Sequence, residues 1–274
     1  MAVTMADITK LRKMTGAGMM DCKNALNEAN GDFDAAMEII RKKGQAIAAK
    51  RSDREASEGC VLAASNGDFA AIVALKCETD FVAKNGDFVA LAQSILDAAM
   101  ANRPTSTEAL LALEVNGQVI SSLITDRIGV TGEKMEIGFY EFVNAATTVA
   151  YIHPGNMLAT IVGFNQEGVE SQVARDVAMQ VAAMNPVAVS KEEVPAEVIE
   201  KELAFGREKA REAGKPENLI ERIAEGGLNK FFQENTLLSQ AFIKDSKQTV
   251  EQYLKSQNKD LTVVAFKRVT LNVE

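Results

Sequence analysis

The spacing of apolar residues changes near residue 59, and this change constrains the fold more than any other feature of the chain. Before it, apolar residues recur at helical spacing. After it come two apolar runs, 59–65 (GCVLAAS) and 69–78 (FAAIVALKCE), which are typical of buried strands. Asn66-Gly67-Asp68 joins the two runs, and Asn-Gly is a strong signal for a tight β-hairpin. The sequence therefore predicts a helical segment followed by an antiparallel sheet.

Residues 4–44 predict three short helices, because apolar side chains recur every three or four positions in each. These side chains are Ile8, Leu11 and Met14 in the first helix, Cys22, Ala25, Leu26 and Ala29 in the second, and Phe33, Ala36, Met37 and Ile40 in the third. We expect Asp32 to cap the third helix and Gly44 to end it. Three such helices bury little surface, so residues 1–54 are predicted to form a small module followed by a basic linker.

The remainder predicts a core of two halves, each with a hairpin, a helix and a return strand. The first half, 55–144, contains the hairpin, a helix from about Asn85 to Met100, a second helix at Gln118–Thr125 and a strand at 133–143. The second half, 145–190 and 230–274, contains strands at 147–153 and 157–164, a helix around 173–184 and a strand at 261–273. The predicted fold class is therefore α+β, with a duplicated core and antiparallel sheets.

Residues 191–229 interrupt the second half with a charge-rich helical pattern. AGKPEN (213–218) breaks this pattern, and a glycine followed by a proline is typical of a turn between two helices. The segment predicts either a helical hairpin that projects as an interaction arm or two ordinary surface helices.

Charge is distributed unevenly along the chain. The formal net charge is −8, but residues 1–54 carry ten Lys and Arg against seven Asp and Glu. Affinity for nucleic acid comes from clustered basic side chains, so the acidic remainder argues against nucleic acid as the main partner. The basic stretch 41–54 is either a solvated helix and linker or a contact for RNA or an acidic protein.

The sequence also indicates a cellular compartment. No apolar run approaches the ~20 residues that a membrane-spanning helix needs, and the N-terminus has no apolar signal core. The three cysteines, Cys22, Cys60 and Cys77, are scattered and odd in number, which argues against a disulfide framework or a metal site. We expect reduced thiols, each a small buried apolar residue, in a cytoplasmic protein.

The residues needed for catalysis are scarce. His153 is the only histidine, so a Ser–His–Asp or Cys–His system would have to use it. It precedes Pro154-Gly155 at the end of a predicted strand, and no phosphate-binding loop occurs in the chain. We therefore expect no enzyme activity, no bound metal and no cofactor, and a structural or contact role for His153. A hydrolase that uses His153 is the weaker alternative.

Two short clusters stand out instead. Met19 and Met20 are adjacent at the start of the second helix, so one of them must face away from the core of so small a module. In CETDFVAKNGDF (77–88), Asp80-Phe81 follows a strand and precedes a helix. Thr79 or Asp80 is suited to capping that helix, with Phe81 packed beneath it. Alternatively, Asp80 and Phe81 protrude toward another protein, and spacing alone favours neither reading decisively.

LRKMTGAGMMDCKNAL (11–26) and TDFVAKN (79–85) resemble the two signatures of the bacterial elongation factor Ts family. The resemblance implies a guanine-nucleotide exchange factor for elongation factor Tu, with a ubiquitin-associated-like N-terminal module and no nucleotide site of its own. It implies that Thr79, Asp80, Phe81 and Val82 dislodge Mg²⁺ from the partner. It places Leu11, Met19, Met20 and His153 in partner contacts. The helical hairpin would mediate a homodimer or a 2:2 complex. The alternative is an adaptor that binds a different protein.

Overall fold

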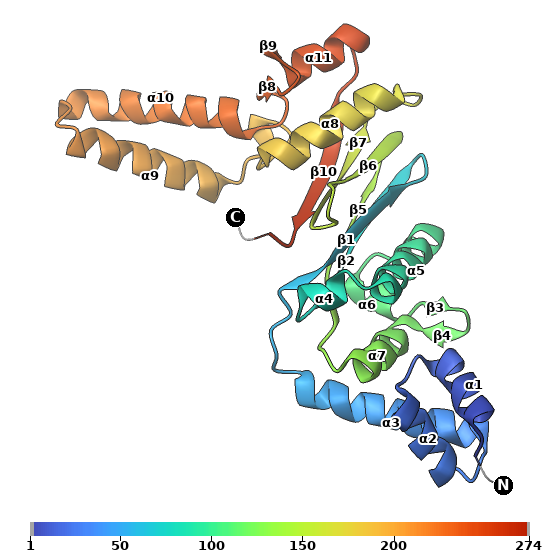
Figure 1. The fold of residues 1–274 in the computed structure, drawn as a ribbon. Helices are drawn as coiled ribbons and strands as arrows, with labels where there is room; N and C mark the ends of the chain where they lie inside the picture. Colours follow the sequence, from blue (N-terminus) through green and yellow to red (C-terminus); the bar gives the residue numbers. More distant parts are fainter. Residues whose placement is uncertain (1–2, 273–274) are drawn as a thin grey trace.

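A small helical module opens the chain in the computed structural model, which describes residues 3–272. Its helices are α1 (Met5–Thr15), α2 (Met19–Glu28) and α3 (Phe33–Arg51). The Thr4 side chain caps α1, and Asp32 caps α3 as predicted, by accepting a hydrogen bond from Ala35 N at 2.9 Å. The buried side chains form a separate small core, made of Ile8, Leu11, Ala17, Cys22, Ala25, Leu26 and Ala36. The module therefore has its own core, apart from the sheets (Figure 1).

The prediction that Gly44 ends the third helix is wrong, because α3 continues to Arg51. Gly44 is buried where α3 crosses α7 (Ile120–Thr131). A Cβ atom added to Gly129 of α7 would lie 2.7 Å from the Cα atom of Gly44. These two glycines let the helix backbones approach closely, and the packing of α3 on α7 offsets the low helix propensity of Gly44.

Two three-stranded antiparallel sheets form the centre of the molecule. The first contains β1 (Glu58–Ser65), β2 (Phe69–Cys77) and β5 (Glu136–Asn144), in the order β1-β2-β5. The second contains β6 (Thr147–Ile152), β7 (Leu158–Phe164) and β10 (Val263–Thr270), in the order β10-β7-β6. In each sheet the second strand of the hairpin is central and the return strand pairs with it. The fold is α+β, and the order of strands agrees between the halves.

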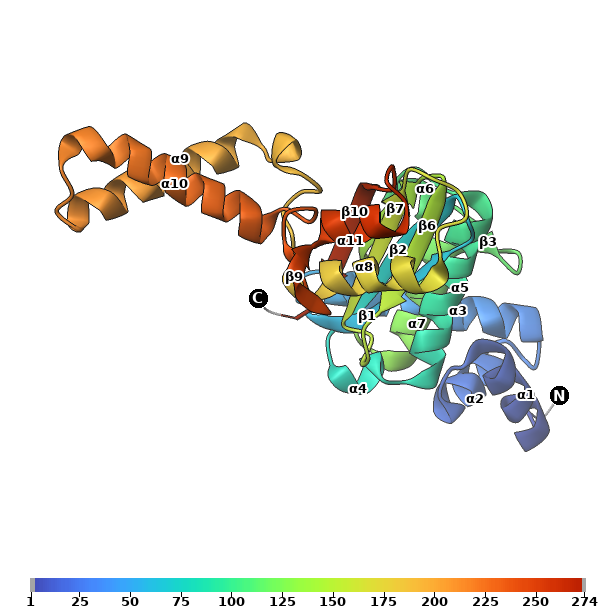
Figure 2. The same ribbon diagram turned by 90° about the horizontal axis from the view of Figure 1, so that it is seen from above.

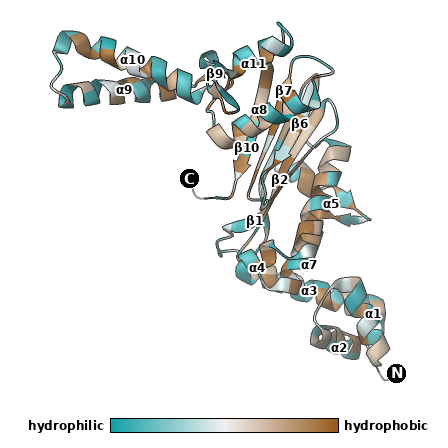
Figure 3. Cartoon of the chain, turned by 45° about the horizontal axis from the view of Figure 1, so that its top comes forward, coloured by the Kyte–Doolittle hydropathy of each residue, from teal (hydrophilic) through white to brown (hydrophobic). Residues whose placement is uncertain are grey.

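The strand β2 explains how the layers are stacked. Alternate residues point to opposite faces, so Val73 and Leu75 pack against the helices while Ile72 and Ala74 pack against the second sheet. From the other sheet, Ala159 and Ile161 complete this inner layer. Both faces of β2 are therefore buried, which accounts for its unbroken apolar run. Figure 3 shows apolar strands at the centre of the molecule.

Helices cover the outer face of each sheet. The first sheet is covered by α5 (Gly86–Asn102), α6 (Thr107–Leu111) and α7, and the second by α8 (Ser171–Met184) and α11 (Val250–Gln257). The helix predicted from Gln118 begins instead at Ile120, because Gln118–Val119 (β4) pairs with Glu114–Val115 (β3). Short elements between α10 and β10, namely β8 (Ala241–Phe242), β9 (Asp245–Thr249) and α11, were not predicted.

The charge-rich insertion is a helical hairpin, which we call the arm. After a short 3₁₀ helix (Lys191–Glu193), it contains α9 (Ala196–Glu212) and α10 (Glu217–Asn235), so α10 continues past residue 229. The arm projects away from the sheets, on the opposite side of the molecule from the helical module (Figures 1 and 2). Of the predicted alternatives, the projecting hairpin is the one observed. No helix among the described residues is long and apolar enough to span a membrane.

Candidate functional site

A short exposed segment joins β2 to α5, and we call residues 79–84 the tip. It contains the one-turn helix α4 (Asp80–Ala83), with Thr79 as its N-cap residue. Directly after the tip, Asn85 caps α5 by accepting a hydrogen bond from Asp87 N at 2.9 Å. Two successive caps therefore replace the single cap that the sequence suggested, and they fold the chain into a compact corner before the long helix starts.

Phe81 protrudes from this corner. Its side chain is 84% exposed, the largest value among the exposed large apolar residues of the described chain, whereas Phe88 at the start of α5 is 1% exposed. Val82 is half-buried and packs against the core cluster beneath the first sheet. The interpretation in which Phe81 packs under the helix is therefore wrong. An isolated aromatic ring with so much apolar surface in water is a common feature of protein-binding sites.

Asp80 presents a carboxylate beside the ring. Its Oδ2 accepts a hydrogen bond from Lys84 Nζ at 2.6 Å, one helical turn further on. This hydrogen bond and the positive charge of Lys84 hold the pKa of Asp80 below its usual value. The tip thus carries a hydrophobic ring and an ionised carboxylate on neighbouring residues, both open to solvent.

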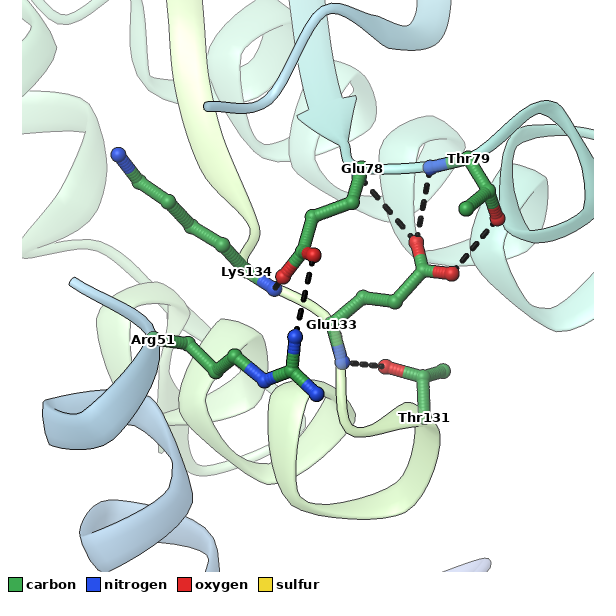
Figure 4. A network of polar contacts seen from close by, with 6 residues as sticks. All are labelled: Arg51, Glu78, Thr79, Thr131, Glu133 and Lys134. Carbon is green, nitrogen blue, oxygen red and sulfur yellow. Dashed lines mark hydrogen bonds and ion pairs between the residues drawn. The ribbon is translucent and has the colours of Figure 1, made fainter. Parts of the chain in front are cut away.

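Glu133, which the sequence did not single out, holds the base of the tip (Figure 4). Its Oε2 accepts hydrogen bonds from Thr79 N at 3.0 Å and from Glu78 N at 3.2 Å. Its Oε1 accepts a hydrogen bond from the Thr79 hydroxyl at 2.6 Å. Glu133 lies in the connection between α7 and β5, 54 residues from Thr79 along the chain. No sequence motif marks a carboxylate whose partners are mainly backbone N–H groups.

Glu78 makes the reverse contact. Its Oε1 accepts a hydrogen bond from Lys134 N at 2.6 Å, and its Oε2 pairs with Arg51 Nη1 at 3.2 Å (Figure 4). Arg51 is the last residue of α3, so the end of the helical module contacts the base of the tip. Each of the two segments therefore binds the other's backbone with a carboxylate, and the module is tied to the same point.

The other predicted contact residues lie in two places. Met20 is 64% exposed and Met19 is half-buried on the core of the module, so the expectation that one of the pair faces outward is confirmed. Leu11 is 0% exposed, which differs from the expectation of a contact residue. Its side chain fills the centre of the three helices and has no free surface to offer a partner. Leu11 supports α1 and α2 rather than contacting anything outside them.

His153 lies in the exposed turn between β6 and β7. Its Nδ1 is 3.0 Å from the Tyr151 hydroxyl, and the Arg175 guanidinium lies over the Tyr151 ring. The same turn reaches the first sheet, where Val61 N donates a hydrogen bond to Asn156 O at 2.7 Å. α4 also contacts β1, so the His153 turn and the tip both lie along that strand. Among residues 3–272, no group of three or more His, Cys, Asp or Glu side chains is arranged to hold a metal ion.

Comparison with known proteins agrees with the two signatures. The family model described as "Elongation factor TS" matches residues 78–273, which begin at the base of the tip. The chain belongs to the elongation factor Ts family. The elongation factor Ts of Porphyromonas gingivalis is 65% identical over the full length of both chains, and that of Azobacteroides pseudotrichonymphae is 58% identical over the same share. That of Phocaeicola vulgatus is 49% identical over 331 aligned positions covering both chains, so it contains residues without a counterpart here. Membership of the elongation factor Ts family makes this chain a translation elongation factor.

Proposed function

We propose that the chain is a guanine-nucleotide exchange factor that binds elongation factor Tu in its GDP form, dislodges Mg²⁺ and promotes GDP release so that GTP can bind. It carries out no chemical step of its own, and its activity belongs to the cytoplasm, where translation takes place. The observation that carries the proposal is the exposed Phe81 beside an ionised Asp80, on a segment that matches a family signature.

The proposed mechanism acts on the partner's metal site. A GTPase holds GDP through phosphate contacts and through Mg²⁺, which keeps several water ligands. Phe81 enters between elements of the GTPase domain, and Asp80 competes for the groups that order the metal's water shell. Because ~1.4 kcal/mol corresponds to a tenfold change in rate, a modest weakening of the metal accelerates release by orders of magnitude. Linkage then requires that bound GDP weakens the affinity for the exchange factor by the same factor by which the bound exchange factor weakens the affinity for GDP.

The remaining predicted residues act as docking surface in this proposal. Met20, supported by Met19, contacts the GTPase domain from a module with a ubiquitin-associated-like fold. His153 contributes a second contact from its turn, and its replacement by alanine should leave much of the activity intact. The two core halves, which share their strand order, form a duplicated scaffold beneath these contacts.

The arm is proposed as the surface for a second copy of the chain, in a homodimer or a 2:2 complex. Phe205 and Ile223 are exposed on the arm. The two helices of the arm, α9 and α10, pack on each other through small residues such as Gly206 and Ala224. Sedimentation should give a smaller molecular mass for the Phe205→Ser variant than for the unchanged chain. Equal masses would contradict the assignment of the arm as the surface for a second copy.

Nucleotide release tests the proposed activity directly. Elongation factor Tu is loaded with a fluorescent GDP analogue, an excess of GDP is added, and the release rate is followed with and without this protein. We expect acceleration that Phe81→Ala and Asp80→Ala each reduce at least tenfold, on the scale of a lost partner contact. Phe139→Ala is the matched control, because Phe139 is an exposed aromatic residue on β5, away from the tip.

Three outcomes are distinct. Acceleration that depends on Asp80 and Phe81 supports the mechanism. Acceleration that is insensitive to both substitutions keeps the function but rejects the mechanism. No acceleration by the unchanged protein rejects the exchange activity and favours the adaptor alternative, in which the chain binds another protein without affecting its nucleotide.

A further inference from the structure

We propose that Glu133 and Glu78 are positioning residues that hold the tip in the orientation needed for exchange. The Glu78 side chain is 17% exposed, and the Glu133 carboxylate is occupied by hydrogen bonds from Glu78 and Thr79. The two carboxylates act on Thr79 and on the backbone at the base of the tip, so the inference rests on the proposed function of Asp80 and Phe81.

The Thr79 hydroxyl has a fixed direction. The Glu133 carboxylate only accepts hydrogen bonds, so at 2.6 Å the hydroxyl must donate to it. The lone pairs of Thr79 Oγ1 are then free to accept the hydrogen bond from Val82 N, at 3.4 Å, that caps α4. Glu133 therefore fixes the direction of the Thr79 hydroxyl proton and the position of the cap oxygen. The helix that this oxygen caps, α4, carries Phe81 next to Val82.

The contacts of Glu133 and Glu78 are reciprocal. Glu133 accepts from the backbone of Glu78 and Thr79, while Glu78 accepts from the backbone of Lys134. The Glu78 side chain is 17% exposed, so water has little access to replace its contacts. Hydrogen bonds to charged groups are stronger than those between neutral groups. The two segments are thereby fixed to each other at a point directly below the tip.

The pairing of β2 with β5 does not include these contacts. The ladder between β2 and β5 ends where Lys76 pairs with Glu136. Glu78, Thr79, Glu133 and Lys134 all lie beyond that last pair, and the core beneath the sheet is apolar. The carboxylates therefore add order where the sheet has ended and the tip begins.

The base of the tip is also linked to the helical module. Arg51, at the end of α3, pairs with Glu78 at 3.2 Å. The close crossing of α3 and α7 at Gly44 and Gly129 gives a second fixed point. The module that carries Met20 is thus held at a set position relative to the tip, and both proposed contact surfaces are presented together.

The test uses full-length Glu133→Ala and Glu133→Gln, each with and without Phe81→Ala. Release from elongation factor Tu is measured at saturating and at limiting exchange factor. We expect Glu133→Ala to lower the saturating rate about tenfold, as expected when backbone donors lose a charged acceptor, and to change the half-saturating concentration less than about twofold, because docking contacts remain. Glu133→Gln should be intermediate, because its amide oxygen still accepts from the backbone, whereas the NH2 group in the place of Oε1 cannot accept from the Thr79 hydroxyl.

The double variant separates positioning from general destabilisation. If Glu133 acts through the tip, Glu133→Ala should lower the saturating rate less in the Phe81→Ala background than in the unchanged protein, because one of the two side chains that it positions is already absent. The control is Asp68→Ala, which removes a two-point carboxylate contact with Arg103 at the β1–β2 turn. An equal loss in both backgrounds, or a loss confined to the half-saturating concentration, overturns the inference.

A spectroscopic measurement keeps the inference independent of exchange activity. Fluorine NMR of protein labelled with fluorophenylalanine reports on Phe81, whose resonance is identified by its absence in Phe81→Ala. We expect Glu133→Ala, and Glu133→Gln if the alanine variant does not fold, to shift or broaden that resonance, and Asp68→Ala to leave it unchanged. An unaltered Phe81 resonance in a folded Glu133 variant overturns the positioning role. Absence of exchange by the unchanged protein, with a shifted resonance, rejects only the proposed function.

Discussion

Gly129 of α7 meets Gly44 of α3 backbone to backbone: a Cβ atom on Gly129 would lie 2.7 Å from the Cα atom of Gly44. The reverse addition is easier, because a Cβ on Gly44 would lie 3.4 Å from Thr125 O and 3.5 Å from the Cα atom of Gly129. The crossing between the helical module and the core is therefore asymmetric, and an alanine should cost more stability at Gly129 than at Gly44.

Gly129→Ala should destabilise the protein and loosen the module, because the new methyl group forces α3 away from α7. Overpacking of this kind costs about 1–3 kcal/mol. Gly44→Ala should be neutral or stabilising by up to ~1 kcal/mol, since alanine has the higher helix propensity. Thermal unfolding of the two variants checks this, and equal midpoints would contradict the asymmetry.

The contribution of Asp80 to exchange should be independent of pH near neutrality. Lys84 lowers the pKa of Asp80, so its carboxylate stays ionised as pH falls until below the usual range of an aspartate. The ratio of the release rates given by the unchanged protein and by Asp80→Asn should be constant between about pH 5.5 and 8. The partner's own pH dependence cancels in this ratio, and a ratio that changes within the interval would show a different ionising group at work.

Cys60 and Cys77 should resist thiol reagents in the folded protein. Burial raises the pKa of Cys60 to about 11 and that of Cys77 to about 12, and both side chains are inaccessible. The thiolate is the reactive form, so labelling at mild pH should proceed only through opening of the sheet. Labelling with a chromogenic disulfide should be slow in buffer and fast in denaturant. Rapid modification of Cys60 or Cys77 in the native protein would mean that the hairpin of β1 and β2 opens readily.

Tyr140 should contribute to alkaline unfolding. Burial raises its pKa to about 12, and its hydroxyl donates a hydrogen bond to Pro104 O at 2.8 Å. A phenol whose pKa is raised on folding stabilises the folded state below its unfolded pKa of about 10. That contribution is lost as pH rises from there toward 12. Above about pH 10, the free energy of unfolding measured in urea should fall less steeply with pH in Tyr140→Phe than in the unchanged protein. Identical slopes would assign the loss of stability to other ionising groups.

The sheets could be predicted from the sequence because a strand that is buried on both faces, such as β2, needs a continuous apolar run, here Phe69–Cys77. Turns with Asn-Gly and caps such as Asp32 are equally local. The prediction that Gly44 ends a helix was wrong, because a glycine that ends a helix and a glycine that lets two helices meet look the same in the sequence. The difference lies in Gly129, 85 residues away.

In the candidate site, too, local features could be predicted from the sequence and distant contacts could not. Phe81 and Phe88 both follow an Asp, yet one protrudes and the other is buried, because the direction of the chain after β2 decides the outcome. That direction is set by Thr79 and Asn85 as successive caps and by Glu133 from a distant connection. Local spacing indicated either a helix cap or a protruding side chain at the tip. The structure contains both, because Thr79 caps α4 and Phe81 protrudes. The Glu133 carboxylate could not be predicted from the sequence, because it binds backbone N–H groups, which every residue except proline has.

The arm leaves the core and returns to it at one place, where Val187 N donates a hydrogen bond to Asn235 O at 2.8 Å and Leu237 N donates to Ala188 O at 2.9 Å. The length of the segment between these points is therefore decoupled from the geometry of the sheets, and lengthening it adds little closure entropy. We therefore expect that a longer, shorter or foreign helical hairpin, or a reporter domain, can replace the arm at this base without moving the tip or the strands.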